Sequence, residues 1–449
     1  MSDGSIDIKE AADAARADAY SQPLESLNPA MPALFQADAM WPYFERLRAE
    51  DPVHWTPDGD NAAHWGVTRY NDIMTVDTNH DVFSSEGGIT LPPSEARVQK
   101  MIEAGAEGGG PGGLFGPPPG QEGQGGGGPR MFIAMDPPRH DEQRKTVSPA
   151  VSPHNLLQME PQIRERAGQI LDALPIGEPF DWVDKVSMEL TAMTLATLFD
   201  MPQVDRRRLT RWSDVVMAQP GHGIVDSWEQ KRAEMFEYGS YFLNLWNERK
   251  SAEPGGDLIS MLAHGAATRD MNQFEYLGNV ILLTIGGNDT TRNTISGSVF
   301  ALNKFPDQYA RLRADPTLIP SMVSETIRWQ TPLAHMRRTA KADFELSGKK
   351  IRAGDLVAMW YVSGNRDETV IENPNAYVID RPRVRQHLSF GFGIHRCVGN
   401  RLAELQLRVI WEEILKRFPT IQLLEEPKRT YSTFVKGYER MQVLIPTRN

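Results

Sequence analysis

Hydrophobic residues recur at steps of three and four over most of the chain after residue 152. After Ser152, which suits a helix N-cap, Ile163, Ala167, Ile170 and Leu174 keep this spacing and predict a helix. The same periodicity predicts further helices over Met188–Phe199, Trp228–Lys250, Gln273–Phe305, Pro306–Arg313, Leu318–Trp329 and about Asn400–Phe418.

Strand-like alternation is shorter and rarer. It covers His64–Tyr70 and the region Arg338–Tyr361, where "SGKK" and "RAGD" predict turns. Near the end of the chain, Thr433–Gly437 and Met441–Pro446 alternate like a pair of strands. Helices outweigh strands, and neither a repeat nor an obvious linker divides the chain. We therefore expect one mainly α domain with small β sheets over residues 31–449.

Two segments fall outside these patterns. Residues 1–30 lack a clear periodicity, and we expect them to be poorly ordered. The segment 105–130 holds 13 of the 37 glycines and several prolines, a composition that does not form a packed helix or strand. It is either a floppy inserted loop or a mobile flap over a binding site.

Composition narrows the classes of protein. Of the 449 residues 40% are hydrophobic and 24% charged, as in an ordinary globular domain, and a net charge of −11 argues against non-specific nucleic-acid binding. The polar N-terminus lacks the features of a signal peptide, and the longest apolar run, "LGNVILLTIGG", is too short to cross a bilayer. A cytoplasmic protein is the simplest interpretation. A single cysteine excludes a disulfide framework, a multi-cysteine zinc site and an iron–sulfur cluster.

That cysteine, Cys397, lies in "FGFGIHRCVGNRLAE", just before the last predicted helix. The free N–H groups and the dipole of a helix N-terminus favour a thiolate there. Gly391, Gly393 and Gly399 allow a tight bend close to something flat and bulky. A cysteine that only fills a core would require neither feature.

At these residues the sequence resembles the haem-thiolate monooxygenases, the cytochromes P450. Their signature is Phe, two residues, Gly, one residue, Arg or His, one residue, Cys, one residue, Gly. Phe390, Gly393, His395, Cys397 and Gly399 match every place. The resemblance implies a helix-rich fold with small β sheets, haem b as cofactor, and the Cys397 thiolate as the axial ligand of its iron, which favours cleavage of the O–O bond.

Further motifs occur in the order that the family has them. Glu325 and Arg328 lie one helical turn apart, and Arg381 follows in "DRPRV". Taken alone, Glu-x-x-Arg is most often a surface ion pair. In the family it forms a structural network with the later arginine, and this network supports the cysteine loop.

The segment "LTIGGNDTTRN" places Gly286 and Gly287 inside an apolar helix, where each costs about 1 kcal/mol relative to alanine. Asp289 and Thr290 follow. A polar kink is the plain explanation. The resemblance instead implies that the helix bends over the haem, that Thr290 hydrogen-bonds the bound oxygen and that Asp289 relays protons.

Haem also carries two propionates, which call for cations. By their positions in the family, His140 and Arg144 at i, i+4, Arg338 at the start of a strand, and His395 in the cysteine loop are the candidates. Each of them alone would more often be a solvated charge.

Within the family the sequence most resembles the bacterial alkane and fatty-acid terminal (omega) hydroxylases. The resemblance implies O₂ as co-substrate and electrons passed from NADH through a reductase and an iron–sulfur ferredoxin. The ferredoxin would meet a positive surface at Arg396, Arg401 and Arg408. Candidates for a narrow apolar substrate pocket, which ordinary core packing would explain equally well, are Ile89, Leu91, Leu282, Ile285, Gly286, Leu333, Phe434 and Val435.

Three alternatives remain open. The first is a monooxygenase of terpenes or other cyclic lipids, which only product analysis distinguishes from the alkane reading. The second is a haem-thiolate protein that binds a ligand without turnover, and the third is a peroxide-driven enzyme. Asp289 and Thr290 argue against the second, because a protein that only binds a ligand has no need of a proton relay. They also argue against the third, because peroxide-driven enzymes usually lack this acid and threonine pair.

Overall fold

The computed structural model describes residues 8–104 and 130–449. Its α-helices in this part of the chain are α1 (Ile8–Ser21), α2 (Pro32–Gln36), α3 (Trp41–Glu50), α4 (Tyr70–Thr78), α5 (Glu95–Glu103), α7 (Arg139–Val147), α8 (Pro153–Asp172), α9 (Glu189–Leu198), α10 (Arg206–Met217), α11 (Trp228–Lys250), α12 (Leu258–His264), α13 (Gln273–Lys304), α14 (Pro306–Ala314), α15 (Ile319–Gln330), α16 (Tyr361–Gly364) and α17 (Asn400–Arg417).

The strands are short and form small sheets. A five-stranded sheet has the order β1-β2-β8-β5-β3, in which β2 and β8 are parallel and the other neighbours antiparallel. A three-stranded sheet has the order β4-β12-β9, and β6–β7 and β10–β11 are separate pairs. Their bounds are β1 (Val53–Thr56), β2 (His64–Val67), β3 (Phe83–Ser84), β4 (Pro179–Asp181), β5 (Met336–Ala340), β6 (Phe344–Leu346), β7 (Lys349–Ile351), β8 (Leu356–Met359), β9 (Gln422–Leu423), β10 (Lys428–Arg429), β11 (Tyr438–Arg440) and β12 (Gln442–Leu444).

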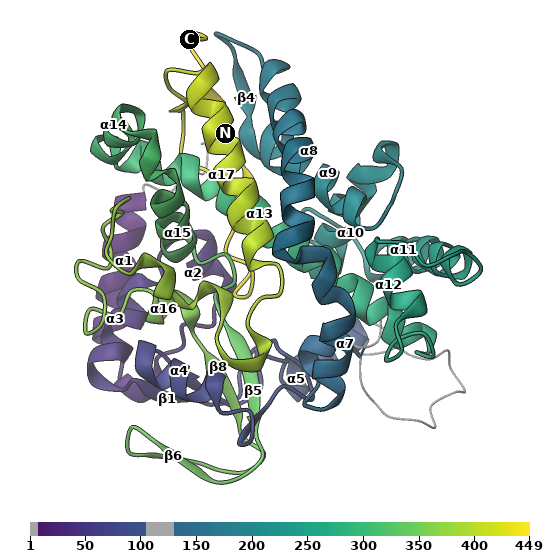
Figure 1. Ribbon diagram of the computed structural model, residues 1–449. Helices are drawn as coiled ribbons and strands as arrows, with labels where there is room; N and C mark the ends of the chain where they lie inside the picture. Colours follow the sequence, from purple (N-terminus) through teal and green to yellow (C-terminus); the bar gives the residue numbers. More distant parts are fainter. Residues whose placement is uncertain (1–7, 105–129) are drawn as a thin grey trace.

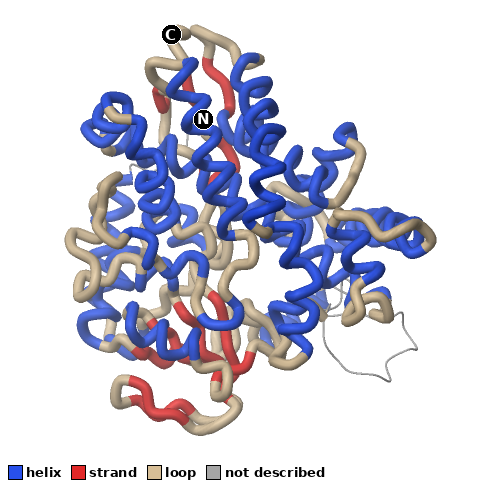
Figure 2. Tube along the Cα trace, in the orientation of Figure 1, coloured by secondary structure: helices blue, strands red, loops and turns tan. Residues whose placement is uncertain are grey.

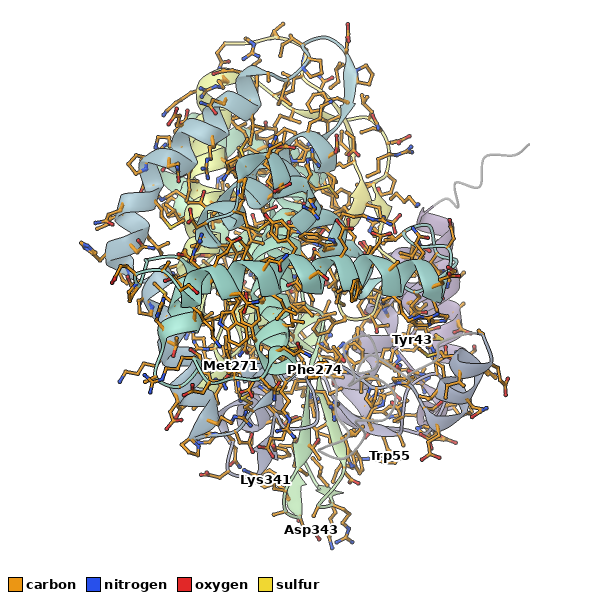
Figure 3. The ribbon with its side chains drawn as sticks, turned by 90° about the vertical axis from the view of Figure 1, so that its right-hand side faces the viewer. Tyr43, Trp55, Met271, Phe274, Lys341 and Asp343 are labelled. Atoms are coloured by element: carbon orange, nitrogen blue, oxygen red, sulfur yellow. The ribbon has the colours of Figure 1, made fainter. Side chains whose placement is uncertain are left out.

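Helix α13 is the centre of the helical part. It packs against α9, α10, α15 and α17, and most of its side chains after Asn288 are buried. Figure 1 shows α17 and α8 side by side in front of α13, with α11 and α12 to the right. Helices fill most of the molecule, whereas the strands of the largest sheet gather at one end (Figure 2). Seen from the side that carries α11 and α12, Lys341 and Asp343 mark the tip of that end, after β5 (Figure 3).

The helical periodicity located most of the helices correctly. Helix α11 has the expected bounds, and α13, α14, α15 and α17 agree to within a residue or two. Ser152 caps α8, because its side chain accepts a hydrogen bond from the Asn155 N–H. Helix α9 begins one residue later than expected, after a turn of π-helix at Val183–Met188.

The expectation of loose order for residues 1–30 was wrong for the described part. Residues Ile8–Ser21 form α1, which packs on α3. Ala15 and Ala19 are buried at this contact, and Arg16 forms an ion pair with Glu45. The alanines of this segment favour a helix, but alanine adds little to a search for apolar periodicity, so that search did not find α1. The interpretations of the glycine-rich segment concern residues 105–129, which lie outside the described residues.

The strand pair expected near the C-terminus was also wrong. Residues Thr433–Gly437 do not pair with β12. Instead their backbone bonds to residues 332–334, and β12 lies between β4 and β9. Alternation marks an extended segment, but it carries no information about which segment lies beside it. In the described part of the chain, none of the helices has the length and apolar character needed to cross a bilayer.

Candidate active site

A cavity of about 1560 Å³ runs from the cysteine loop, residues 388–399, past α13. Its walls also include β5, α7, the end of α10 and the segment 431–434. Cys397, Thr290 and Phe434 all line it. The single cysteine and Thr290 of α13 therefore face one space.

The cysteine loop is tightly folded. The Cys397 N–H donates to the Phe390 carbonyl at 2.8 Å, which closes the bend. Gly391 and Gly393 have φ of 64° and 66°, and a Cβ on Gly393 would lie 2.6 Å from the Asp77 carbonyl oxygen. Glycine is therefore required at Gly393 both by its backbone conformation and by its contact.

The expected effect of the helix N-terminus on Cys397 is present, but burial opposes it. Burial raises the pKa of the Cys397 thiol, while the Gly399 N–H and the positive charges of Arg144 and Arg396 lower it. The thiol lies partly open to the cavity. A cation bound in the cavity would displace its proton.

Behind the loop, Glu325, Arg328 and Arg381 form a buried network. Both nitrogens Nε and Nη2 of Arg328 donate to Glu325 at 2.7 Å, and Arg381 Nε lies 3.1 Å from both carboxylate oxygens. The Val378 N–H donates to Glu325 as well, at 2.8 Å. Glu325 has no exposed surface, so the interpretation as a surface ion pair does not apply.

Asn365 connects this network to the cysteine loop, and sequence reasoning missed it. Arg328 donates to the Asn365 carbonyl at 2.8 Å. The Asn365 amide in turn accepts from the Leu388 N–H at 2.7 Å and donates to the Ser389 hydroxyl at 2.9 Å. The backbone before Cys397 thus rests on the network through one side-chain amide.

Histidines lie beside the cysteine at the wall of the cavity. His140 and His395 stack edge to face with ring centroids 4.2 Å apart. Within the described residues, both ring nitrogens of His395 and Nε2 of His140 are buried without a hydrogen-bond partner. Burial and nearby arginines lower the pKa of His395 to about 2, and burial lowers the pKa of His140. Unpaired buried nitrogens call for a ligand or water.

The two arginines expected near these histidines differ in their surroundings. Arg144 lies on α7 one turn after His140 and donates to the Arg396 carbonyl. Arg338 is buried and donates to Asp77 at 2.9 Å. Asp77 also accepts from the Phe392 N–H at 2.7 Å and from the Tyr361 hydroxyl at 3.0 Å. Asp77, another residue that sequence reasoning missed, ties β5 to the cysteine loop.

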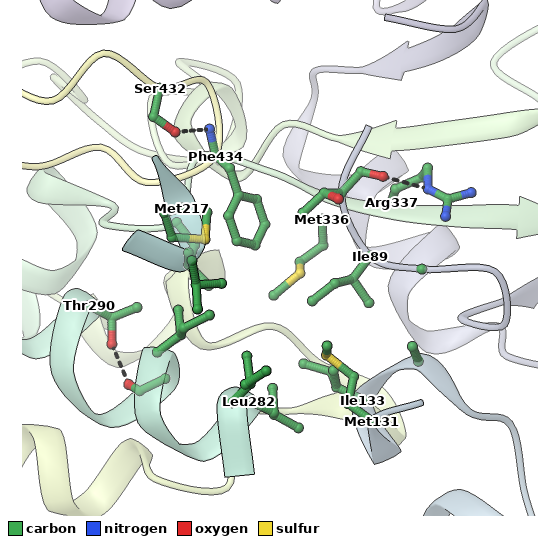
Figure 4. Close-up of a pocket in the computed structure, with 18 of the residues that line it drawn as sticks. Ile89, Met131, Ile133, Met217, Leu282, Thr290, Met336, Arg337, Ser432 and Phe434 are labelled. Carbon is green, nitrogen blue, oxygen red and sulfur yellow. Dashed lines mark hydrogen bonds between the residues drawn. The ribbon is translucent and has the colours of Figure 1, made fainter. Parts of the chain in front are cut away.

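On α13, Asp289 and Thr290 point to different environments. The Thr290 hydroxyl donates to the Gly286 carbonyl at 2.8 Å and lines the cavity (Figure 4). Asp289 is buried and lies 3.0 Å from Arg292, which also pairs with Asp214 of α10. Burial and the charge of Asp214 raise the pKa of Asp289 to about 6, while Arg292 opposes the rise.

The apolar wall contains most of the expected pocket residues. Figure 4 shows Ile89, Leu282, Met336 and Phe434 around one space. The expected residues that line the cavity are Ile89, Leu91, Leu282, Ile285, Gly286, Leu333 and Phe434. The prediction that Val435 lines the pocket was wrong. Its side chain is buried away from the cavity, because neighbouring residues of an extended segment point to opposite sides.

Comparison with known proteins decides the family. The Cytochrome P450 family model matches residues 246–445. Linalool 8-monooxygenase of Pseudomonas putida is 34% identical over 92% of this chain and 97% of its own length. The methyl-branched lipid omega-hydroxylase of Mycobacterium tuberculosis is 30% identical over 89% and 90%. The solved structure of CYP153D17 from Sphingomonas sp. PAMC 26605 is 45% identical, covers 93% and 98%, and superposes with a TM-score of 0.81.

The chain belongs to the cytochrome P450 family. It is a monooxygenase whose cofactor is haem b, as the family requires. The residues around the cavity fit that cofactor. The thiol provides a ligand for a metal. The two arginines and the three buried histidine nitrogens without partners provide partners for two carboxylates.

Other residues of the P450 cavity were missed by sequence reasoning, and some of them left a signal. Met336 stands two residues before Arg338 on β5, so the same strand points both to the cavity. Met217 ends α10, a helix whose three- and four-residue spacing was present in the sequence. Met131 and Ile133 follow directly on the glycine-rich segment and had no periodic pattern to mark them (Figure 4).

Proposed function

We propose that this cytochrome P450 hydroxylates the terminal carbon of medium-chain alkanes or fatty acids, with electrons from an iron–sulfur ferredoxin and its reductase. The observation that carries the proposal is the apolar wall beside Thr290, made of Leu282, Ile285, Phe434 and their neighbours. Such a wall gives a hydrocarbon chain no polar handle near the reacting carbon. The similarity to a lipid omega-hydroxylase and to CYP153D17 supports the same reading.

In the proposed site the Cys397 thiolate would hold the haem iron, and His140, Arg144, Arg338 and His395 would hold the propionates. Thiolate-ligated haem supplies the chemistry that splits O₂ and inserts one oxygen atom into a C–H bond. The protein residues position the haem and the substrate and keep water from the apolar wall. Glu325, Arg328 and Arg381 position the cysteine loop indirectly. Arg328 binds Asn365, and the Asn365 amide binds the backbone of the loop.

Proton supply is the proposed role of Asp289 and Thr290. The Thr290 hydroxyl donates to the Gly286 carbonyl, and Thr290 lines the cavity. Asp289, with its pKa raised to about 6, holds and releases a proton close to neutral pH. Arg292 joins it to Asp214, which is partly exposed on α10. A path of ionisable groups thus leads from the surface toward α13.

Oxidation at the terminal carbon has to be enforced by the shape of the pocket, because the inner methylene groups of the chain are easier to oxidise. A hydrophobic pocket separates chains that differ by one methylene only about 10–200-fold. We therefore propose a preference for medium chains rather than a single length. Ile89, Leu333 and Phe434 come from three different segments and together enclose the chain near Thr290.

A terpene is the second candidate substrate, because linalool 8-monooxygenase is 34% identical over 92% of the chain. The test offers octane, dodecanoate and linalool together to the holoenzyme with a surrogate ferredoxin and reductase. A 1-alkanol or an ω-hydroxy acid as main product is the expected result. Oxidised linalool alone would overturn the terminal-hydroxylase proposal in favour of the terpene.

For the ferredoxin we propose a docking face around Arg396 and Arg401, which are both exposed. Arg408, the third expected cation, forms ion pairs with Glu160 and Glu412, so it offers less free charge. Arg401→Glu should slow electron transfer at low ionic strength, measured by stopped-flow reduction. An unchanged rate would count against this face.

A further inference from the structure

A buried lysine lies in the wall of the cavity, on the first turn of α11. Lys231 is only 4% exposed, and it lines the cavity together with Trp228. Its Nζ donates to the carbonyls of Val216 at 3.0 Å and Ala218 at 2.7 Å, at the C-terminal end of α10. An ammonium has three N–H groups, so two carbonyls leave one donor for another partner.

The charge of Lys231 lacks a counter-ion among the described residues. The ion pairs of residues 8–104 and 130–449 do not include it, and Asp226, which also lines the cavity, is exposed and beyond ion-pair distance. The Trp228 ring, 5.6 Å away, offers only a cation–π contact. Burial accordingly lowers the pKa of Lys231 to about 8. A buried charge of this kind gains from an anion placed beside it.

A helix cap explains part of this arrangement. A lysine at the C-terminal carbonyls of α10 stabilises that helix. Capping alone is available to an exposed lysine as well, and it does not account for a buried ammonium in the wall of a substrate cavity. The remaining donor and the missing counter-ion both indicate an anionic ligand.

We propose that Lys231 binds the carboxylate of a fatty-acid substrate, whose alkyl chain then follows the apolar wall to Thr290. The inference rests on the terminal-hydroxylase proposal and selects fatty acids within it. A carboxylate accepts the charged hydrogen bond that Lys231 lacks, while the rest of the chain needs only apolar contacts. Because Lys231 and Thr290 stand on separate helices, α11 and α13, the anchor fixes which end of the chain reaches Thr290.

The test measures Kd of the holoenzyme for dodecanoate and for dodecan-1-ol, an uncharged probe of equal length, by titration calorimetry. Lys231→Met should weaken dodecanoate binding about 10- to 100-fold, as expected for one charged hydrogen bond. The preference for dodecanoate over dodecan-1-ol should fall by the same factor. Lys231→Arg should retain most of the preference, because it keeps the charge.

Lys100 offers a matched control, since it lines the same cavity but is exposed. Lys100→Met should change the preference less than threefold. Equal weakening of both probes by Lys231→Met would show a capping role alone and overturn the inference, as would an unchanged preference. The product decides the underlying proposal separately: if the wild-type protein oxidises dodecanoate only at inner carbons, terminal hydroxylation fails whatever Lys231 does.

Discussion

Replacing Glu325 by Gln would remove the centre of the network behind the cysteine loop. All groups that face the carboxylate are donors: two nitrogens of Arg328, Nε of Arg381 and the Val378 N–H. The glutamine amide has one oxygen that accepts and one nitrogen that only donates. In either orientation the amide nitrogen therefore faces N–H groups that cannot accept its hydrogen bond. The better orientation turns the amide nitrogen toward Arg328 Nε. It loses that charged hydrogen bond and one branch of the bond from Arg381 Nε, whose other branch to the remaining oxygen is kept.

The lost charged hydrogen bond costs about 1.5–3 kcal/mol. Glu325→Gln also removes the charge that pairs with Arg328 and Arg381, so the free energy of unfolding should fall by about 3–5 kcal/mol, as expected when a buried ion pair loses one partner. Urea unfolding followed by tryptophan fluorescence measures the loss. Glu345→Gln, at an exposed position of β6, is the control and should stay within about 0.5 kcal/mol. A loss below 1 kcal/mol for Glu325→Gln would refute this account of the network.

Three further predictions concern the site itself. Thr290→Ala should bind haem and substrate but divert NADH into peroxide or water, so the ratio of product to NADH should fall; full coupling would contradict the proton role. Because the folded pKa of Asp289, about 6, lies above the ordinary 3.8, its ionisation destabilises the fold. The stability of the wild type relative to Asp289→Asn should therefore fall as pH rises from about 4 to about 6 and stay level above. Urea titrations at several pH values measure this difference. A rise in relative stability over the same pH range would contradict the raised pKa of Asp289. Cys397→Ser should lose the absorption spectrum of thiolate-ligated haem while circular dichroism keeps its helical signal; an unchanged spectrum would exclude Cys397 as ligand.

The parts of the fold that follow from local pattern were predictable. Helix α11 and the Ser152 cap are properties of consecutive residues, and so is the glycine-rich bend before Cys397. The P450 resemblance added residues such as His140 and His395, which lie far apart in sequence and meet at 4.2 Å. No spacing rule would have joined them.

What failed depended on contacts between distant segments. The segment around Val435 pairs with residues 332–334, about 100 residues earlier, and Asp77 reaches the cysteine loop from α4. In the sequence Lys231 is one of several charged residues on a long predicted helix. Its value as a candidate appeared only when α10 and the cavity were seen to enclose it.

The largest sheet has a consequence for the way in which this chain folds. Its strands β1, β2 and β3 lie within residues 53–84, whereas β5 and β8 lie within residues 336–359, and the parallel pair joins Trp65 to Val357. On a ribosome the first strands emerge long before their partners exist, and closing so long a loop is slow. The edges of the early strands therefore remain unpaired while the ribosome synthesises the helical part. A nascent chain that stops before Leu356 would expose the edge of β2, where association with other chains begins.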